Sequence, residues 1–268
     1  MSDVERPLRS GGRFAVSAVD GPPGRVIKRG PAGPLAREAR ALRRVSRLGV
    51  APRLISAEPG AIVMESVDGM ARPLDRLAPR DAAALGRTLR AVHDSRRTAT
   101  GWLPGWPSRA GTLDAYRRRR AADTRITAGR EAGFVDRVID ALPPVTGGAD
   151  ALPFRLLHGD LVSSNMLWTP RPQLVDWEFW RMGDPAEDLA YLVEVNAMPE
   201  SVFADVLDAY GDRSVAARVD GWRALCALDA GLWYRNAGAE RTARRLLRRA
   251  GELSRVLPGR LNNSVPGN

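Results

Sequence analysis

The chain has 268 residues, of which 44% are hydrophobic and 27% charged, proportions that are ordinary for a globular protein. No apolar run approaches the roughly 18 residues that a membrane span needs, and the first residues lack the apolar core of a signal peptide. A single cysteine excludes an intrachain disulfide and a cysteine-based zinc cluster, and two histidines argue against a histidine metal site. We therefore expect a cytoplasmic protein with one large or two modest domains and no membrane partner.

The net charge of +10 has two interpretations: a nucleic-acid or membrane-surface binder, or a solvated surface rich in arginine. The arginines gather in short runs at 116–120 and 241–249. Aromatic residues do not alternate with the arginines there, as stacking platforms for bases would. The pattern favours a solvated basic surface, and we do not expect a nucleic-acid partner.

The amino-terminal part of the chain predicts a small, mostly β unit with one helix. Alternating and β-branched residues predict strands at 14–19, 25–29, 52–58 and 61–67. Between the second and third of these, apolar residues recur at helical spacing over 34–48, and Gly49 is placed to end that helix. Glu38 shares the apolar face of the helix, so it either has a buried partner or is an ordinary exposed glutamate.

Lys28 is the only lysine among 41 basic side chains, and it lies on the second predicted strand. Lysine is a compact point charge on a flexible stem, whereas arginine is a planar fork. A single lysine marks either a site where the fork does not fit or a chance survivor of a composition that disfavours lysine. If the site exists, Glu38, ten positions later on the neighbouring helix, can hold the ammonium in place.

After residue 67 the pattern becomes mainly helical. A helix is predicted at 81–95 with Asp81 as its N-cap, and further helices near 113–122 and 130–141. Loops are predicted at 96–111 and 143–150, and short strands in 154–160, 165–168 and 173–178. From Asp184 to about residue 257 the chain predicts helices with breaks near 198–200 and 211–213.

Residues 156–192 hold the densest set of chemically useful side chains. Carboxylates with an intervening asparagine and no cysteine are oxygen ligands of the kind that suits Mg²⁺. Asn165 and Asp176 lie at the ends of two predicted short strands and can converge on one ion. Asp160 is then left to receive a proton from an attacking hydroxyl. Together with a cation on the phosphates, supplied by Lys28, this is the set that phosphoryl transfer needs.

These segments resemble a known family. "HGDLVSSN" (158–165) is similar to the H-G-D-x-x-x-x-N loop of aminoglycoside phosphotransferases and of choline, ethanolamine and thiamine kinases. "LVDWEFWRMGDPAEDLA" (174–190) resembles the metal-binding segment of the same superfamily. The likeness is weaker upstream, in "RVIK", "REARAL", "IVMESVDG" and "LRAVHDS", where Val92 stands in place of the usual leucine.

The resemblance implies an α+β, protein-kinase-like two-lobed fold, with a small β-rich nucleotide-binding lobe at 1–67 and a larger helical lobe at 68–268. It also implies ATP and Mg²⁺. Position by position, it implies the following roles: Asp160 as catalytic base, Asn165 and Asp176 as metal ligands, Lys28 on the nucleotide phosphates and paired with Glu38, and Glu65, Ser66 and Val67 around the adenine. Asp188 resembles a buried aspartate that holds the catalytic loop, which is a structural role.

The chain departs from the family pattern in two places. The phosphate-covering loop has only "RSGGRF" (9–14), so nucleotide contacts at Gly11 and Gly12 compete with a plain turn. Glu178 stands where protein kinases have a glycine. It can contact a second magnesium ion, bind a cationic substrate or cap a strand, and the sequence does not choose among these.

The acceptor is expected to be a small molecule, because no long activation segment follows Asp176 that could dock a peptide. Four acidic residues favour a cationic acceptor, although capping and solvation explain them equally: Glu178, Asp184, Glu187 and Glu194. Five tryptophans can form a cage for a quaternary ammonium or can pack in a core: Trp102, Trp106, Trp177, Trp180 and Trp233. We single out Glu178 and Trp180 as candidate substrate residues.

The sequence thus predicts an ATP- and Mg²⁺-dependent O-phosphotransferase that acts on a hydroxyl of a small cationic molecule. A cationic antibiotic, either an aminoglycoside or a basic cyclic peptide, is the first expectation. A choline, ethanolamine or thiamine kinase is the second. A kinase-like binding protein without catalysis is the third, and the presence of a candidate base at Asp160 argues against it.

Overall fold

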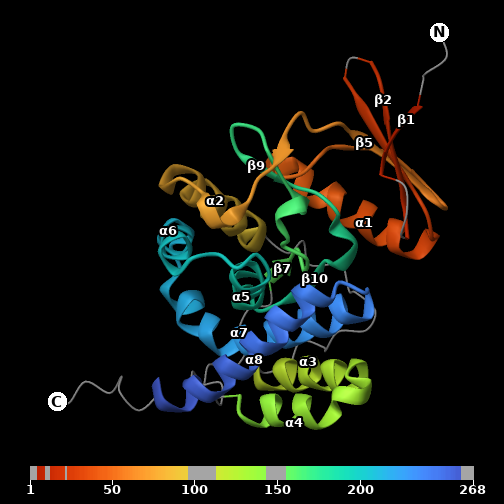
Figure 1. Cartoon of the computed structure of the whole chain (residues 1–268). Helices are drawn as coiled ribbons and strands as arrows, with labels where there is room; N and C mark the ends of the chain where they lie inside the picture. Colours follow the sequence, from red (N-terminus) through yellow and green to blue (C-terminus); the bar gives the residue numbers. More distant parts are fainter. Residues whose placement is uncertain (1–4, 10–12, 22, 96–112, 143–154, 261–268) are drawn as a thin grey trace. The chain divides into compact units, whose positions relative to one another are not determined.

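The computed structural model describes residues 5–9, 13–21, 23–95, 113–142 and 155–260 (Figure 1). The chain divides into two compact units. The first comprises 1–100, 156–181 and 201–211, and the second comprises 101–155, 182–200 and 212–268. Gly11, Gly12, Trp102 and Trp106 lie outside the described residues, so their predicted roles are not addressed by the structure. None of the helices in the described part of the chain is long and apolar enough to cross a membrane.

An antiparallel five-stranded sheet forms the amino-terminal part of the first unit (Figure 1). Its strands are β1 (Glu5–Arg9), β2 (Ala15–Val19), β3 (Arg25–Arg29), β4 (Leu54–Glu58) and β5 (Ala61–Glu65), in the order β1-β2-β3-β5-β4. The four predicted strands are confirmed. The strand β1 was not predicted, because its sequence is charged and contains Pro7, which a sheet accepts at an edge position such as this one.

The helix α1 (Ala32–Val45) packs against β4 and β5 in the same unit, as Figure 1 also shows. Its buried apolar side chains lie at the predicted helical spacing. A short 3₁₀ turn, η1 (Ser46–Leu48), extends it, and Gly49 ends that turn in the left-handed region with φ of 67°. The predicted helix and its stop signal are therefore confirmed. Glu38 lies on the buried face and is 1% exposed.

The rest of the first unit is a small sheet and two helices. The sheet has the order β6-β8-β9 and consists of β6 (Met70–Ala71), β8 (Met166–Trp168) and β9 (Pro172–Leu174). The helices are α2 (Pro79–Asp94) and α6 (Glu200–Tyr210), with the 3₁₀ turns η2 (Leu74–Arg76), η4 (Ser163–Asn165) and η5 (Trp177–Phe179). A Cβ on Gly86 of α2 would overlap the carbonyl oxygen of Val206, so the two helices approach closely there.

The start of α2 differs from the prediction. Ala78 is its N-cap and Pro79 opens the first turn, whereas Asp81 lies inside that turn. Proline suits this position, because its fixed φ matches the helix and its missing N–H would lack a partner anyway. Asp81 still complements the positive end of the helix dipole. The first-turn chemistry was recognised, but the capping residue was wrong.

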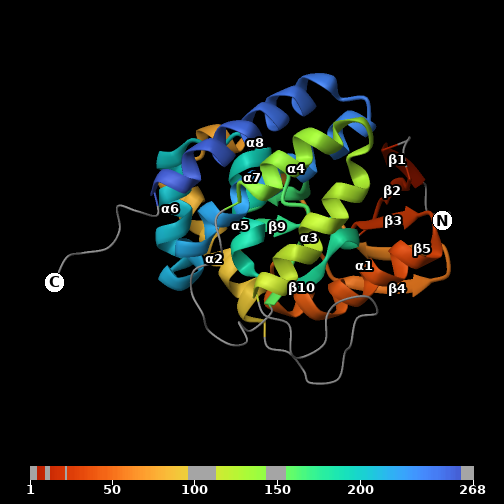
Figure 2. The ribbon, with the colours of Figure 1, turned by 90° about the horizontal axis from the view of Figure 1, so that it is seen from below.

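The second unit is helical in its described residues (Figure 2). It contains α3 (Leu113–Thr127), η3 (Gly129–Glu131), α4 (Ala132–Asp140), α5 (Pro185–Val195), α7 (Arg213–Asn236) and α8 (Glu240–Arg260). Helix α7 packs along α8 and α5, and α3 and α4 also contact α7. Two short strands, β7 (Arg155–Leu157) and β10 (Arg181–Gly183), occur where the chain passes from one unit to the other.

The predicted breaks near 198–200 and 211–213 are confirmed, and the structure adds a third break between α7 and α8. There Gly238 adopts φ of 77°, which glycine tolerates without a steric penalty. Asp184 caps α5, as expected: its side chain accepts a hydrogen bond from the backbone N–H of Ala186, and Pro185 occupies the first turn.

Candidate active site

Lys28 lies in the first unit between two carboxylates. It is on β3 and is 5% exposed. Its Nζ is 2.6 Å from Oε2 of Glu38 on α1 and 2.6 Å from Oδ1 of Asp176, which precedes η5. The ring of Phe14 lies 4.3 Å from the ammonium, measured to the ring centroid. The only lysine of the chain therefore joins the neighbouring helix α1 to Asp176, which is 148 positions away in the sequence.

The charges in this cluster compensate one another. Burial lowers the pKa of Lys28, but Glu38 and Asp176 outweigh burial, so its pKa is raised and the ammonium is charged at neutral pH. Burial raises the pKa of Glu38, and the ion pair with Lys28 opposes that effect. A buried charge is tolerated only when it is paired. Removal of any one member would therefore leave an uncompensated charge or polar group in the cluster.

The loop that follows β7 carries Asp160 and is held by the buried side chain of His158. The backbone N–H of Asp160 donates to Nδ1 of His158 (3.2 Å), and Nε2 of His158 lies 3.0 Å from the carbonyl oxygen of Val175. These two contacts fit a neutral imidazole with its proton on Nε2. The ring of Trp177 packs on the imidazole, with the centroids 4.5 Å apart. His158 thus joins the loop of Asp160 to the segment of Asp176.

Position 159, between His158 and Asp160, accommodates only glycine. Its φ is 83°, and an added Cβ would overlap the carbonyl oxygen of Phe179 in η5. Only glycine combines this backbone conformation with so close an approach. The H-G-D triplet was recognisable as a motif in the sequence, but the positioning roles of His158 and Gly159 were not. Both depend on contacts with residues 175–179, about twenty positions further along the chain.

Asp160 and Asn165 contact each other directly. Nδ2 of Asn165 donates to Oδ2 of Asp160 (2.9 Å) and to its backbone oxygen (3.1 Å). The backbone N–H of Val175 donates to the carbonyl oxygen of Asn165 (3.0 Å), so the residue before Asp176 is anchored beside Asn165. The structure therefore brings the three predicted polar residues of the 156–192 region into one neighbourhood.

Asp176 adopts an unusual backbone conformation, with φ of 64° and ψ of 63°. A non-glycine residue in the left-handed region is uncommon and often occurs at functional sites, where the surrounding structure enforces it. Here the hydrogen bond from the Val175 N–H to Asn165 holds the backbone before Asp176, and the ion pair with Lys28 holds the side chain of Asp176. The conformation aims the carboxylate at Lys28.

The donor set fits a magnesium ion. The side-chain amide of Asn165 uses its Nδ2 on Asp160, which leaves the side-chain Oδ1 for a ligand. Lys28 bonds Oδ1 of Asp176, which leaves Oδ2 of that carboxylate. Magnesium typically takes one or two protein oxygens and completes its shell with phosphate and water. Among the described residues no group of three or more His, Cys, Asp or Glu side chains forms a complete metal cage. An ion shared with a nucleotide needs no such cage.

Glu65, Ser66 and Val67 form the end of β5 and the residues that follow it. The amides of Glu65 and Ser66 are already bonded, to the carbonyl oxygens of Arg53 (2.9 Å) and Gly24 (2.8 Å) respectively. Within the described part of the chain, the amide of Val67 makes no such bond. Its N–H is therefore available to the edge of a planar base.

The two candidate substrate residues differ in their surroundings. Glu178 lies within η5 and its side chain contacts Nη1 of Arg13 at 3.4 Å. Burial, reinforced by the charge of Asp176, raises its pKa. Trp180 is 3% exposed, and its Nε1 donates to the carbonyl oxygen of Arg37 (2.7 Å). Its ring packs in the protein, so a substrate role for Trp180 needs a rearrangement, whereas Glu178 is partly accessible.

The remaining acidic candidates lie in the second unit, and each is buried and paired. Asp184 accepts from Arg218 and from the indole of Trp222, in addition to capping α5. Glu187 accepts from Tyr116 and Arg120, and Glu194 accepts from Arg223 and Arg249. These arginines neutralise the carboxylates within their own unit. The contacts of Asp184, Glu187 and Glu194 therefore support a role in capping and in internal ion pairs, and not in binding a cationic acceptor.

The described tryptophans of the proposed cage also have packing roles. Trp177 is buried and donates to the carbonyl oxygen of Leu174 (2.8 Å). Trp233, in the second unit, is 56% exposed and makes an edge contact with Tyr234, with the ring centroids 5.0 Å apart. Of the described members, Trp233 alone presents a large open ring surface.

Comparisons with known proteins identify the family of the chain. Residues 4–228 match the phosphotransferase enzyme family, APH. Viomycin phosphotransferase from Streptomyces vinaceus is 34% identical over 110 residues, which are 38% of this chain and 35% of that protein. A LicA homologue from Mycoplasma capricolum is 28% identical over 167 residues, 60% of this chain and 62% of that protein. The chain thus spans less than two thirds of either relative.

Solved structures show the same fold at low identity. Choline kinase from Cryptosporidium parvum has a TM-score of 0.73 at 13% identity, covering 96% of this chain and 90% of that one. An ADP-bound aminoglycoside phosphotransferase, APH(2″)-Ib, has a TM-score of 0.65 at 14% identity, covering 94% and 92%. The predicted kinase-like fold, an antiparallel sheet followed by a mostly helical part, is confirmed. The chain is a member of the phosphotransferase enzyme family.

Proposed function

We propose that this protein is an ATP- and Mg²⁺-dependent phosphotransferase that moves the γ-phosphoryl group of ATP to a hydroxyl of a small cationic molecule. Family membership and the kinase-like fold support the reaction class. The observation that carries the proposal is the contact of Lys28 with both Glu38 and Asp176, next to the Asp160–Asn165 pair. These are the parts that phosphoryl transfer requires.

Each residue has a distinct proposed role. Asp160 orients the acceptor hydroxyl and receives its proton as the oxygen attacks phosphorus. Lys28 binds phosphate oxygens of the nucleotide, and Glu38 fixes the direction of its ammonium. Glu65, Ser66 and Val67 hold the adenine through their backbone. Asn165 and Asp176 would hold magnesium, which supplies charge neutralisation on the phosphates.

In the proposed reaction, Lys28 exchanges its contact with Asp176 for one with a phosphate oxygen of the nucleotide. In the structure, Oδ1 of Asp176 lies 2.6 Å from the ammonium nitrogen. With a nucleotide bound and that contact exchanged, Asp176 and Asn165 would hold the metal, which would neutralise charge on the phosphates. Glu38 keeps the ammonium in place during this exchange, since Glu38 and Lys28 are both almost fully buried.

Two acceptor classes remain, and the relatives divide between them. Viomycin phosphotransferase supports a cationic antibiotic, either a basic cyclic peptide or an aminoglycoside, as the acceptor. The LicA homologue and the choline kinase structure support the alternative, a choline, ethanolamine or thiamine kinase. Viomycin phosphotransferase has the higher identity, so antibiotic inactivation is the first proposal. In the first unit, Glu178 is the carboxylate best placed to attract a cation.

The test is a panel of acceptors incubated with ATP and magnesium. It should contain viomycin, streptomycin, choline, ethanolamine and thiamine, with ADP release and a phosphoryl mass increment as joint readouts. Asp160→Asn serves as the matched control for contaminating kinases. An acceptor that gains the increment with the native chain and not with the variant supports the proposal. If no acceptor gains it while ATP still binds, the non-catalytic alternative is favoured.

A further inference from the structure

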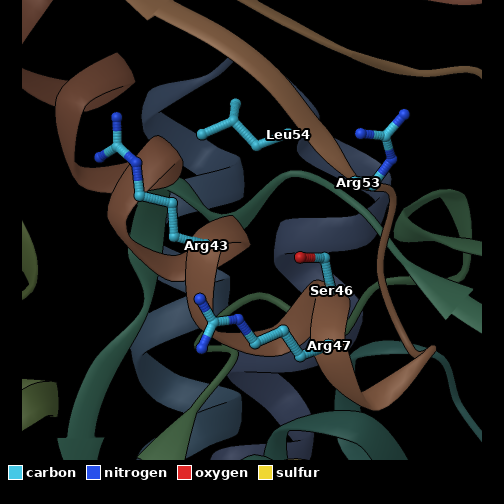
Figure 3. Close-up of a pocket in the computed structure, with 5 residues that line it drawn as sticks. All are labelled: Arg43, Ser46, Arg47, Arg53 and Leu54. Carbon is cyan, nitrogen blue, oxygen red and sulfur yellow. The ribbon is translucent and has the colours of Figure 1, made fainter.

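The first unit contains a basic pocket at the carboxyl-terminal end of α1, the helix that carries Glu38. Arg43 belongs to the last turn of α1, and Ser46 and Arg47 belong to η1. Arg53 and Leu54 line the other side, at the start of β4 (Figure 3). The pocket encloses about 340 Å³. Every charged residue that lines it is an arginine.

The charge of this pocket is incompletely balanced. In the described part of the chain, neither Arg43 nor Arg47 pairs with a carboxylate. Arg53 donates from Nε and Nη2 to one oxygen of Glu65, so this carboxylate engages Arg53. Leu54 supplies an apolar wall and Ser46 a hydroxyl. Two arginines are thus left to bind a ligand.

The helix dipole does not account for the whole arrangement. A basic residue such as Arg43 in the last turn of α1 complements the partial negative charge of that end. Arg53, however, comes from a different element, and a dipole effect does not require a pocket between the two. Arginine forks match the oxygens of phosphate and carboxylate, and bonds of this kind are among the strongest that proteins make.

We propose that this pocket is a binding site for a small phosphorylated anion, separate from the nucleotide site. Its volume lies near the lower end of the range for small-molecule sites, roughly 300–1,000 Å³. That size is sufficient for a pyrophosphate-like group. Arg43 and Arg47 bind the oxygens with their forks, Ser46 donates its hydroxyl, and Arg53 contributes while it remains on Glu65. This site does not depend on the identity of the acceptor.

The probe is inorganic pyrophosphate, titrated calorimetrically into the full-length protein with EDTA present. Arg43→Ala and Arg47→Ala remove a fork each, and we expect either to weaken binding by roughly tenfold or more, because a charge-assisted bond contributes about 1.5–3 kcal/mol. The matched control is Arg40→Ala. Arg40 is also exposed on α1 and its loss changes the net charge equally, but it does not line the pocket.

Each outcome decides the proposal. Loss of binding in both pocket variants, with near-native binding in Arg40→Ala and in Lys28→Arg, supports a site outside the catalytic centre. Equal weakening by Arg40→Ala would show diffuse attraction to a basic surface, and an absence of saturable binding at low salt would also overturn the site. A short RNA that binds more tightly than pyrophosphate, regardless of the variant, would favour a nucleic-acid surface instead. Arg43→Lys and Arg47→Lys, which keep the charge and lose the fork, decide the matter if an alanine variant does not fold.

Discussion

Arg37 and Trp180 exchange two hydrogen bonds although they are 143 positions apart. Nη2 of Arg37 donates to the carbonyl oxygen of Trp180 (3.0 Å), and the indole Nε1 of Trp180 donates to the carbonyl oxygen of Arg37 (2.7 Å). Arg37 is the neighbour of Glu38 on α1, and Trp180 follows η5 directly. The pair therefore connects α1, which carries the Lys28 partner Glu38, to the segment that begins with Asp176.

Replacing Trp180 with phenylalanine keeps most of the buried ring and removes the indole donor. We expect a loss of about 1 kcal/mol in the free energy of unfolding, the usual net value of one hydrogen bond, measured by urea denaturation. If the tie also sets the position of Glu38, the KM for ATP rises while the KM for the acceptor changes little. Phe179→Leu, a change in the same turn at a side chain that is 41% exposed, is the control and should alter neither quantity. A Trp180→Phe protein with native stability and kinetics would show that the tie is dispensable.

Asp160→Asn tests the proposed base. The amide is nearly isosteric, so the contact with Asn165 can persist while the proton acceptor is lost. We expect kcat to fall by roughly 10²–10⁴, the usual contribution of general-base catalysis, with little change in the KM for ATP. Steady-state kinetics with the acceptor found in the panel provide the measurement. Near-native turnover would exclude Asp160 from the base role.

Lys28→Arg tests why the chain has one lysine. The ammonium is enclosed by Glu38, Asp176 and the ring of Phe14, and a planar fork is longer and wider than the point charge it replaces. We expect weaker ATP binding, measured by calorimetry, and lower kcat. Arg29→Lys, on the same strand but on the exposed face, is the matched control and should behave as the native protein. Unchanged affinity and rate in Lys28→Arg would make the single lysine an accident of composition.

The sequence predicted those features that depend on local patterns. The strands around Lys28, the helix of Glu38 and the cap at Asp184 follow from alternation, helical spacing and turn chemistry over a few residues. The edge strand β1 escaped prediction because it has no apolar pattern of its own and depends on pairing with β2. The break at Gly238 was missed because basic and apolar residues continue on both sides of it.

The site shows the same division between local and distant information. The polar residues at 28, 38, 160, 165 and 176 were identifiable by type and spacing. The partners that position them were not, because His158 contacts Val175 and Arg37 contacts Trp180 only after the chain has folded. The acidic residues from 184 onward were ambiguous for a related reason. Their neutralising arginines, such as Arg218 and Arg223, come from helix α7, and no local pattern links them to the carboxylates.

Glu194→Ala tests the stability of the second unit. Glu194 is 3% exposed and accepts from Arg223, which itself is 7% exposed. Burial tends to lower the pKa of Arg223, but the contacts with Glu200 and Glu194 outweigh that effect and raise it. An arginine is not deprotonated in proteins at neutral pH, so the guanidinium stays charged when Glu194 is removed. Breaking a buried pair costs about 3–5 kcal/mol, and we expect a loss near the lower end of that range, because Arg223 loses its buried partner but keeps the exposed Glu200.

Glu200→Ala is the control for this change, because it removes a second carboxylate from the same arginine. The Glu200 side chain is 66% exposed, so solvent screens its ion pair with Arg223, and we expect its loss to cost less than about 1 kcal/mol. Urea denaturation of both variants at neutral pH gives the comparison. Equal losses in the two variants would mean that burial does not determine the strength of these pairs. A much larger loss in Glu194→Ala would show that the buried carboxylate, through Arg223 on α7 and Arg249 on α8, stabilises the packing of α5.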